Sequence, residues 1–197
     1  MKRTATVERK TRETDIRLHL DLDGRGTSNI DTGIPFFDHM LELLSAHGFM
    51  DLEIQARGDT QIDDHHTVED LGICFGAALG QALDGKSGIR RYGFSFVPMD
   101  EALARIAIDM SNRPFLRYRV DLKSSKAGAF DVGLLREFFR ALVTHAGMTL
   151  HVDLLEGEDA HHCAESIFKA LGRALDQATQ PEKRLNGHPL STKGTLS

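Results

Sequence analysis

Two short histidine-rich motifs contain the residues of this sequence best suited to chemistry. Each reads His-His-x-x-Glu, first at residues 65–69 and again at residues 161–165, 96 positions later (161 − 65). On a helix, Glu69 would share a surface with His65 and His66, because side chains three or four positions apart are neighbours. The two rings would lie about 100° apart and face different directions. Imidazole and carboxylate donors together suit zinc, iron, nickel or manganese better than calcium. The motifs therefore predict binding of more than one metal.

The two motifs belong to a longer internal repeat. Aligning residues 64–82 with 160–178 pairs both histidines and the glutamate of each motif, together with five glycine, alanine, leucine and glutamine positions. A lone His-His pair is usually a surface accident, but a duplication that keeps the triplet favours a metal site. A second stretch, residues 36–47, aligns with 134–145 and places His39 opposite Glu137. The pairing is informative, because histidine and glutamate are both metal donors and here occupy one repeat-related position.

The predicted elements give an α+β fold of two tandem half-domain repeats. Alternating apolar residues predict strands, and apolar residues at helical spacing predict helices. The strands are expected at 14–23, 52–56, 106–110, 115–120 and 148–152, and the helices at 36–47, 65–83, 134–145 and 162–178. We expect one domain over residues 1–197, with repeats at about 1–90 and 91–190 and a short polar tail that would fray by default. The helices should pack as a four-helix layer between two mostly antiparallel sheets.

Three glycines recur at every fourth position of the second expected helix. Gly72, Gly76 and Gly80 each cost helix propensity, up to about 1 kcal/mol relative to alanine. Glycines at this spacing are expected to let another helix approach closely. Cys74 and Cys163 lie inside two of the helical runs and are expected to be small buried hydrophobic residues rather than a disulfide.

Composition excludes several classes of protein. The 197 residues are 41% hydrophobic, enough for a sizeable core, and the formal charge of −5 argues against a nucleic-acid binder. The basic start is followed by no apolar run, so we expect no signal peptide. The longest apolar stretch, residues 71–83, is shorter than the ~20 residues that a bilayer requires. We therefore expect a cytoplasmic protein.

Six histidines at motif or repeat-related positions exceed what one metal ion binds, so two metal sites are the simplest hypothesis. Octahedral manganese or iron would leave coordination positions open for a substrate. Taken alone, Glu13 reads as a solvated edge charge, His39 as a capping or solvated residue, and Lys169 as a solvated lysine. Two alternatives use the same donors. One is a metal-dependent hydrolase, and the other is a non-catalytic metal-binding or shell-forming protein.

Over essentially its whole length the sequence resembles imidazoleglycerol-phosphate dehydratase, a family of histidine biosynthesis. Five motifs in order and at this spacing carry the resemblance. They are Phe37-Asp38-His39-Met40-Leu41, Asp63-Asp64-His65-His66-Thr67-Val68-Glu69-Asp70, Ser111-Asn112-Arg113-Pro114, His161-His162-x-x-Glu165 and Ser191-Thr192-Lys193-Gly194.

The resemblance implies a manganese-dependent hydro-lyase. It would remove water from D-erythro-imidazole-glycerol phosphate to give imidazole-acetol phosphate through a metal-bound imidazolate, with two Mn²⁺ ions per active site. It also implies self-association into a shell of twenty-four subunits with active sites between subunits. The implied metal ligands are His39, His65, His66, Glu69, His161, His162 and Glu165.

The same resemblance implies the residues that touch the substrate. They are Glu13, His39, His47, His65, His66, Glu69, Arg91, Arg113, His161, His162, Lys169, Ser191, Thr192 and Lys193. Catalytic roles fall to Glu13, Glu69 and Glu165, with Glu13 as the candidate acid that protonates the departing hydroxyl. Some family members carry a ligating histidine at the position of Glu137. That glutamate either ligates as a carboxylate or leaves its metal with one donor fewer.

Overall fold

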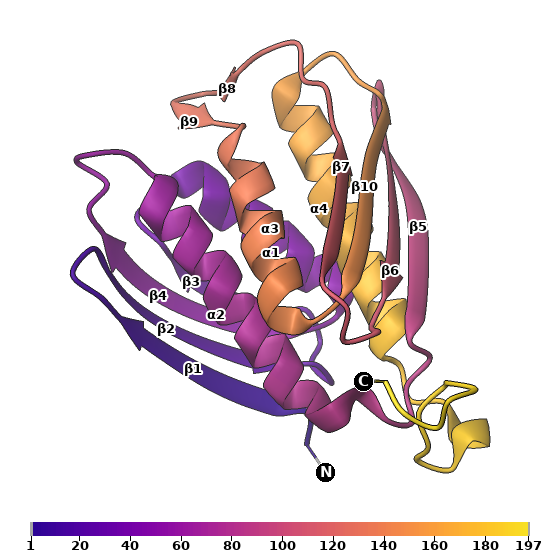
Figure 1. Ribbon diagram of the computed structural model, residues 1–197. Coiled ribbons are helices and arrows are strands. Elements are labelled where there is room, and N and C mark those ends of the chain that lie inside the picture. The colour runs from indigo at the N-terminus through magenta and orange to yellow at the C-terminus, as the bar shows by residue number, and fades with distance from the viewer. Residues whose placement is uncertain (1, 197) are drawn as a thin grey trace.

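The computed structural model describes residues 2–196 and divides them into two halves with the same order of main elements (Figure 1). The first half comprises β1 (Thr4–Lys10), β2 (Thr14–Asp21), β3 (Ser28–Asp31), α1 (Pro35–Gly48), β4 (Asp51–Gly58) and α2 (His65–Leu83). The second comprises β5 (Tyr92–Met99), β6 (Ala102–Asp109), β7 (Phe115–Arg119), α3 (Leu134–Ala146), β10 (Thr149–Glu156) and α4 (Ala160–Thr179). A small hairpin, β8 (Lys126–Ala127) and β9 (Phe130–Asp131), precedes α3. The 3₁₀ turns η1 (Asp84–Lys86) and η2 (Lys183–Leu185) follow α2 and α4.

Each half builds one four-stranded sheet, with strand order β1-β2-β4-β3 in the first and β5-β6-β10-β7 in the second. Neighbouring strands run antiparallel except for the pairs β3–β4 and β7–β10, which are parallel. The parallel pairs arise because a helix, α1 or α3, lies between the paired strands in the chain. Four α-helices and two mixed sheets within residues 2–196 confirm the predicted α+β class.

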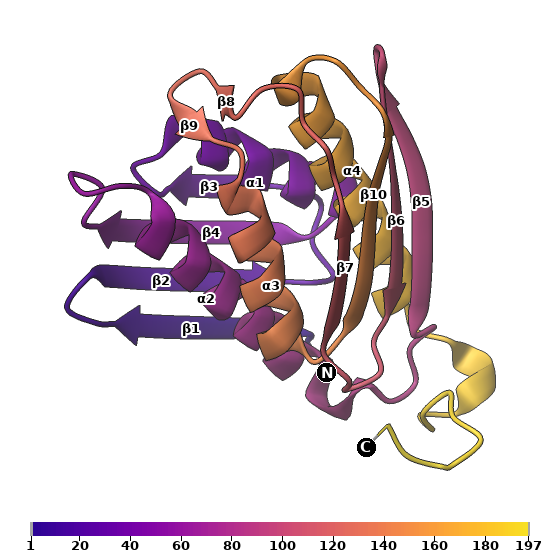
Figure 2. The same cartoon turned by 45° about the horizontal axis from the view of Figure 1, so that its top comes forward.

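The helices pack against one face of each sheet and against one another. Helices α1 and α2 contact the first sheet, whereas α4 and α3 contact the second (Figure 2). Across the middle, α2 packs on α3 and α1 packs on α4. A Cβ atom at Gly72 would lie 2.6 Å from the Phe138 carbonyl oxygen, and one at Gly76 would lie 2.6 Å from that of Leu142. These two glycines therefore let α3 approach, as predicted.

The core lies between the sheets and is filled by aromatic and aliphatic side chains. Four fully buried rings cluster at the point where α1, α3 and α4 meet, namely Phe37, Phe138, Phe139 and Phe168. On β2, Ile16, Leu18 and Leu20 face this core while their neighbours face outward, which is the expected alternation. Cys74 and Cys163 are buried and free. Each is thus a small core residue, as predicted.

Several strands and the tail differ from expectation. Strand β5 was missed because its outward residues Tyr92, Phe94 and Phe96 are exposed aromatics, so its pattern does not alternate between apolar and polar. The edge strands β1 and β3 bury too few apolar residues to give a signal. The expected strand at 14–23 ends at Asp21, because the Asp23 N–H turns back to donate to the Asp21 carboxylate. The tail is not frayed, since Leu196 is buried against the molecule.

The two sheets present different outer faces. The first carries polar side chains that include Arg17, His19, Glu53 and Gln55, whereas the second exposes Tyr92, Phe94, Phe96 and Phe115. Such a concentration of exposed aromatic area is unusual for a protein surface in contact with water alone. No helix within residues 2–196 is both long and apolar enough to span a bilayer.

Candidate active site

Two histidines and a glutamate converge where α1 and α4 begin. The Nε2 atoms of His39 and His161 each lie 3.0 Å from Glu165 Oε1. The three donor atoms all lie within 4.8 Å of one another, close enough to hold one metal ion. Pro35 in the first turn of α1 and Asp159 at the start of α4 fix these helix ends, and the Asp159 carboxylate accepts from two backbone N–H groups of α4. We call this group the first metal cluster.

Lys169 supports the carboxylate of the first metal cluster from the other side. Its Nζ lies 2.6 Å from Glu165 Oε2, one helical turn along α4. Burial alone would raise the pKa of Glu165, but hydrogen bonds from Lys169, His39 and His161 outweigh burial and lower that pKa to about 2. Glu165 is therefore an anion at neutral pH, which is the form that binds metal. Lys169 is largely buried against it rather than solvated.

The corresponding residues of the other half form a second cluster at the start of α2. His65 Nε2 lies 3.7 Å from Glu69 Oε2. The guanidinium of Arg140 lies between two carboxylates, 3.4 Å from Glu69 and 2.7 Å from Glu137. We call His65, Glu69 and Glu137 the second metal cluster because they match the first in the repeat, although among residues 2–196 only the first has three donor atoms close enough to hold one ion. In the repeat, His65, Glu69 and Glu137 correspond to His161, Glu165 and His39 of the first cluster. An arginine, however, lies between the two acids of the second cluster.

The second histidine of each motif faces a different set of acids. His66 Nδ1 lies 3.1 Å from Asp59 and its Nε2 lies 3.9 Å from Glu13, whereas His162 Nδ1 lies 2.8 Å from Glu101. The hydrogen bond that His66 donates to Asp59 raises the pKa of His66, and the one that His162 donates to Glu101 raises the pKa of His162. Each ring is thus oriented by a carboxylate on one nitrogen, as carboxylates orient metal-binding histidines through the ring nitrogen that does not bind the metal.

His47 lies near the end of α1 and carries a neutral ring. Burial lowers its pKa, and the nearby charges of Lys169 and Arg173 lower it further. Its repeat partner His145 instead bonds through Nδ1 to the Ala141 carbonyl oxygen of its own helix. The structure therefore places His47, but not His145, beside the lysine that supports the first metal cluster.

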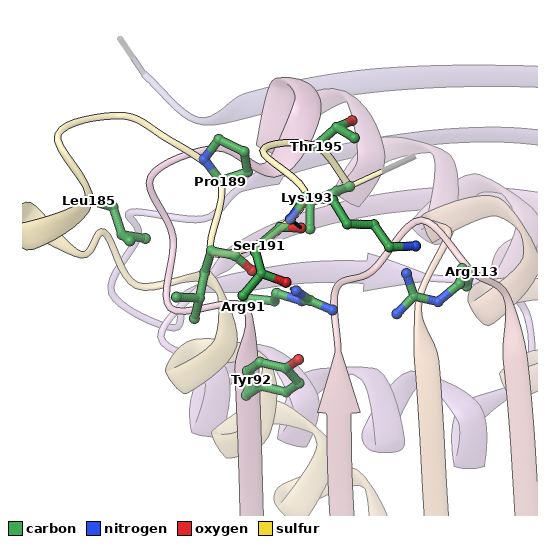
Figure 3. Close-up of a pocket in the computed structure, with 11 residues that line it drawn as sticks. Arg91, Tyr92, Arg113, Leu185, Pro189, Ser191, Lys193 and Thr195 are labelled. Atoms are coloured by element: carbon green, nitrogen blue, oxygen red, sulfur yellow. Dashed lines mark hydrogen bonds between the residues drawn. The ribbon is translucent and has the colours of Figure 1, made fainter.

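A basic cavity of about 770 Å³ lies at the other end of the molecule, where the tail folds over the start of β5 (Figure 3). Arg91, Arg113 and Lys193 direct their cationic groups into the same space. The cavity is also lined by Tyr92, Leu185, Pro189, Leu190, Ser191, Thr192, Thr195 and Leu196. We call this cavity the anion pocket.

Arg91 holds the anion pocket together. Its Nε and one terminal nitrogen bond both oxygens of Asp109, at 2.6 and 3.0 Å, and its other terminal nitrogen donates to the Leu190 carbonyl oxygen at 2.6 Å. Arg113 reaches the same Asp109 carboxylate at 3.5 Å but is mostly exposed. Three cations around one carboxylate leave the pocket with net positive charge. Such a pocket suits a phosphate group, which arginine and lysine bind through charge-assisted hydrogen bonds.

The first metal cluster and the anion pocket lie at opposite ends of α4. His161 is in the first turn of that helix, whereas the Arg91 N–H donates to the carbonyl oxygen of Ala178 in its last turn. Seventeen residues (178 − 161) at 1.5 Å each separate them by about 25 Å. One small molecule could not reach both within one chain.

The structure brings together three of the sequence-predicted donors, His39, His161 and Glu165, and it also places beside the predicted site residues several partners that the sequence did not indicate. The residues missed are Asp59, Glu101, Asp109 and Arg140, each of which contacts a predicted site residue. Asp59, Glu101 and Asp109 lie in or beside turns, and Arg140 lies on the polar side of an amphipathic helix, where charged residues are ordinary. Only the fold brings them to the site, so no local pattern could have identified them.

Comparison with known proteins identifies relatives over the whole chain. A family model described as imidazoleglycerol-phosphate dehydratase matches residues 32–175. Proteins named imidazoleglycerol-phosphate dehydratase from Thioalkalivibrio sulfidiphilus and Syntrophobacter fumaroxidans are 55% and 56% identical, over 98% and 99% of this chain and 98% of each relative. The crystal structure of the enzyme from Staphylococcus aureus is similar at a TM-score of 0.82, with 40% identity, 90% of this chain and 99% of that one covered. The crystal structure of the protein from Pyrococcus furiosus, in complex with (S)-C348, is also similar at a TM-score of 0.82. It is 36% identical, and the match covers 96% of this chain and 99% of that one.

Proposed function

The chain belongs to the imidazoleglycerol-phosphate dehydratase family, and from that membership we propose how its two clusters and its anion pocket divide the work of the reaction. The protein removes water from D-erythro-imidazole-glycerol phosphate to give imidazole-acetol phosphate in histidine biosynthesis. The substrate therefore offers an imidazole ring at one end and a phosphate at the other. The observation that carries the assignment is the pairing of a His–His–Glu cluster with a separate basic pocket.

We propose that manganese binds at both metal clusters. The fit is supported by the first cluster, where two imidazole nitrogens and one ionised carboxylate oxygen lie within 4.8 Å of one another. His66 and His162, oriented by Asp59 and Glu101, would complete the donor set from neighbouring chains. When bound, the ions supply Lewis-acid polarisation of the substrate imidazole and lower the pKa of its N–H. In the second cluster, Glu137 would act as a carboxylate ligand once Arg140 has moved away.

The anion pocket would bind the substrate phosphate. Arg113 and Lys193 provide exposed cations, and Ser191 and Thr192 provide neutral donors beside them. Arg91 is committed to Asp109 and Leu190, so its main part is to hold the tail and the pocket wall in place while adding positive charge. This arrangement would fix one end of the substrate and leave the imidazole end free to reach the metal clusters.

Residues of the chain itself would carry the protons. Glu13 is exposed and lies 3.9 Å from His66, so its carboxyl group stands beside a proposed metal ligand. We propose that Glu13 protonates the departing hydroxyl, while Glu69 and Glu165 hold the histidines and the metal in position. His47 and Lys169 would contact the substrate from the side of α1 and α4.

The active site would be completed by a second chain. The first metal cluster and the anion pocket are about 25 Å apart along α4, which is far beyond the length of the substrate. A metal cluster of one chain therefore has to meet the anion pocket of another. The exposed aromatic residues of the second sheet would be covered in such an assembly. We propose a closed shell of twenty-four subunits working in the cytoplasm.

We also infer that the chain is one domain that arose by tandem duplication. The two halves share the order of their main elements and corresponding strand orders, and the His-His-x-x-Glu motif stands at the start of α2 and α4. The packing of α2 on α3 and of α1 on α4 supports the proposed four-helix layer.

Two experiments test these assignments. Turnover of imidazole-glycerol phosphate should require manganese and should stop when a chelator removes it. Glu165→Gln and Glu69→Gln should each lower bound manganese and turnover together. If both variants keep full manganese content and full rate, the ligand assignment is wrong.

Complementation tests the shared active site. Glu165→Gln, damaged at the metal cluster, and Lys193→Ala, damaged at the anion pocket, are unfolded together and refolded as a mixture. Mixed assemblies contain some sites built from two intact contributions, so at substrate concentrations well below KM, where Lys193→Ala is slow, the mixture should be more active than either variant refolded alone. Activity equal to the average of the two separate variants would mean that each chain builds its own site.

A further inference from the structure

Lys86 is a buried lysine that the metal clusters and the anion pocket do not use. It lies in η1, the turn that links the two halves, and only 4% of its surface is exposed. Its Nζ donates to three oxygens, namely the backbone carbonyls of Ala146 at 2.6 Å and Gly147 at 2.8 Å, and the Asn112 side chain at 2.5 Å. All three protons of its ammonium group are therefore used.

The partners of Lys86 are neutral. Among residues 2–196 no carboxylate forms an ion pair with it, and burial lowers its pKa to about 8. A buried ammonium without a carboxylate is costly, so its hydrogen bonds have to be well formed. The two carbonyls belong to the C-terminal end of α3, where unpaired carbonyls and the helix dipole favour a cation.

The third partner, Asn112, connects Lys86 to the anion pocket. Asn112 has a left-handed backbone at φ 58°, and the next residue is Arg113, whose guanidinium enters the pocket. The same turn is also joined to the start of β5, because the Met110 N–H donates to the carbonyl oxygen of the pocket residue Arg91 at 3.0 Å. Of these contacts, the one from Lys86 ties the turn to α3 and to the linker between the halves.

Gly147 shows how closely the amine is held. Its backbone has φ 60°, and a Cβ atom there would lie 3.1 Å from Lys86 Nζ and 3.3 Å from Asn112 Oδ1. The lysine amine and the asparagine amide thus pass directly over a position that only glycine fills without strain.

We propose that Lys86 is a positioning residue for phosphate binding, because it fixes the turn that carries Arg113 against the end of α3. The inference rests on the proposed function of the anion pocket. Lys86 does not touch the substrate. It holds the Arg113 backbone at the place from which the guanidinium reaches a phosphate, and this limits the arrangements that the turn explores before binding.

The test compares Lys86→Met with the wild-type protein. Methionine keeps most of the side-chain volume and removes the three donors. We expect KM for imidazole-glycerol phosphate to rise about tenfold while kcat changes by less than about twofold. The inhibition constant of inorganic phosphate, a competitor for the pocket, should rise by the same factor as KM. The matched control is Lys123→Met. Lys123 is an exposed lysine that follows β7 and pairs with Glu158, so its replacement should change neither constant.

Asn112→Gly supplies a second variant if Lys86→Met fails to fold. Glycine accepts the φ of 58° and removes only the acceptor side chain, so KM and the phosphate constant should again rise together. The double variant should be no worse than the more affected single one, because both remove the same contact.

Three results separate the possible failures. Unchanged KM and phosphate constants in both folded single variants would overturn the role of Lys86. The role of Lys86 would also be overturned if the KM of the double variant rose by the product of the two single-variant factors. Absence of competitive inhibition by phosphate in the wild-type protein would instead refute the anion pocket itself.

Discussion

The guanidinium of Arg140 lies 2.7 Å from Glu137 Oε2, one turn along the same helix, and it also reaches Glu69. In the internal repeat, Arg140 occupies the position of Glu42, whose carboxylate lies 3.9 Å from His39 (140 − 98 = 42). The charge beside the donors is therefore reversed between the two clusters. The second metal cluster contains a resident cation where the first contains an additional acid.

This reversal predicts that Arg140→Gln binds manganese more tightly. Removing a positive charge next to Glu69 and Glu137 should tighten the weaker of the two binding steps about three- to tenfold, or roughly 1 kcal/mol. Equilibrium dialysis of the metal-free protein against buffered manganese measures both steps. Arg136→Gln, an exposed arginine on the same helix, is the control. Equal affinity in wild type and Arg140→Gln would show that the guanidinium does not compete with the ion.

Lys193→Ala should raise KM about tenfold and leave kcat within about twofold, since a phosphate contact acts alike in the ground and transition states. Steady-state turnover measures both constants. Lys183→Ala, an exposed lysine in η2 just before the tail, serves as the control. If Lys193→Ala had the same KM as the wild-type protein, the tail lysine would not contact the substrate.

Asp153 predicts an acid-dependent loss of stability. Its buried carboxylate on β10 pairs with Arg119 and with Arg105, and the hydrogen bond from Arg119 is the main cause of its lowered pKa. A carboxyl group with a folded pKa below its unfolded value of about 3.9 stabilises the protein above that pH, and this contribution disappears as the pH falls through the folded pKa.

Asp153→Asn should therefore lose about 1–3 kcal/mol at pH 7, where two arginines lose their charged partner. Urea unfolding at pH 7, 5 and 3 measures the difference from wild type, which should be the same at pH 7 and 5 and narrower at pH 3. A difference that does not vary with pH would show that the carboxylate charge is not what stabilises the strand.

Two glycines of α2 make a matched pair for testing the helix contact. At Gly76 a Cβ atom would lie 2.6 Å from the Leu142 carbonyl oxygen, whereas at Gly80 the nearest atom would be 3.6 Å away. Gly76→Ala should cost about 1–3 kcal/mol by pushing α2 and α3 apart. Gly80→Ala should instead stabilise the protein by up to about 1 kcal/mol through helix propensity. Thermal unfolding distinguishes them, and destabilisation of similar size in both would contradict the packing.

The sequence predicted the helices and strands that bury one face in the core and expose polar residues on the other. Helices α1 to α4 have apolar residues at helical spacing, and their predicted ends lie within two residues of the observed ones. Strand β5 was missed because its outward face is aromatic, so alternation disappears. At residues 84–88 nothing in the local pattern shows that Lys86 is buried beneath the end of α3.

The sequence indicated candidate donors but not how they pair in the fold. The duplicated motif identified His161 and Glu165, and the repeat alignment placed His39 opposite Glu137. That His39 approaches Glu165, 126 residues away in the chain, depends on how α1 and α4 pack and has no local signal. The Arg140 bridge is equally invisible, because an arginine on the polar side of a helix is the ordinary case.

The length of α4 has a genetic consequence. The two ends of this helix would belong to different active sites. Consider a cell that makes normal chains and damaged chains in equal amounts. If the damaged chain is altered at both ends, the cell loses more than half of its intact active sites. Random mixing leaves about one quarter of the units intact, whereas damage at one end leaves about half. A double lesion such as His161→Ala with Lys193→Ala should therefore behave as a partly dominant allele.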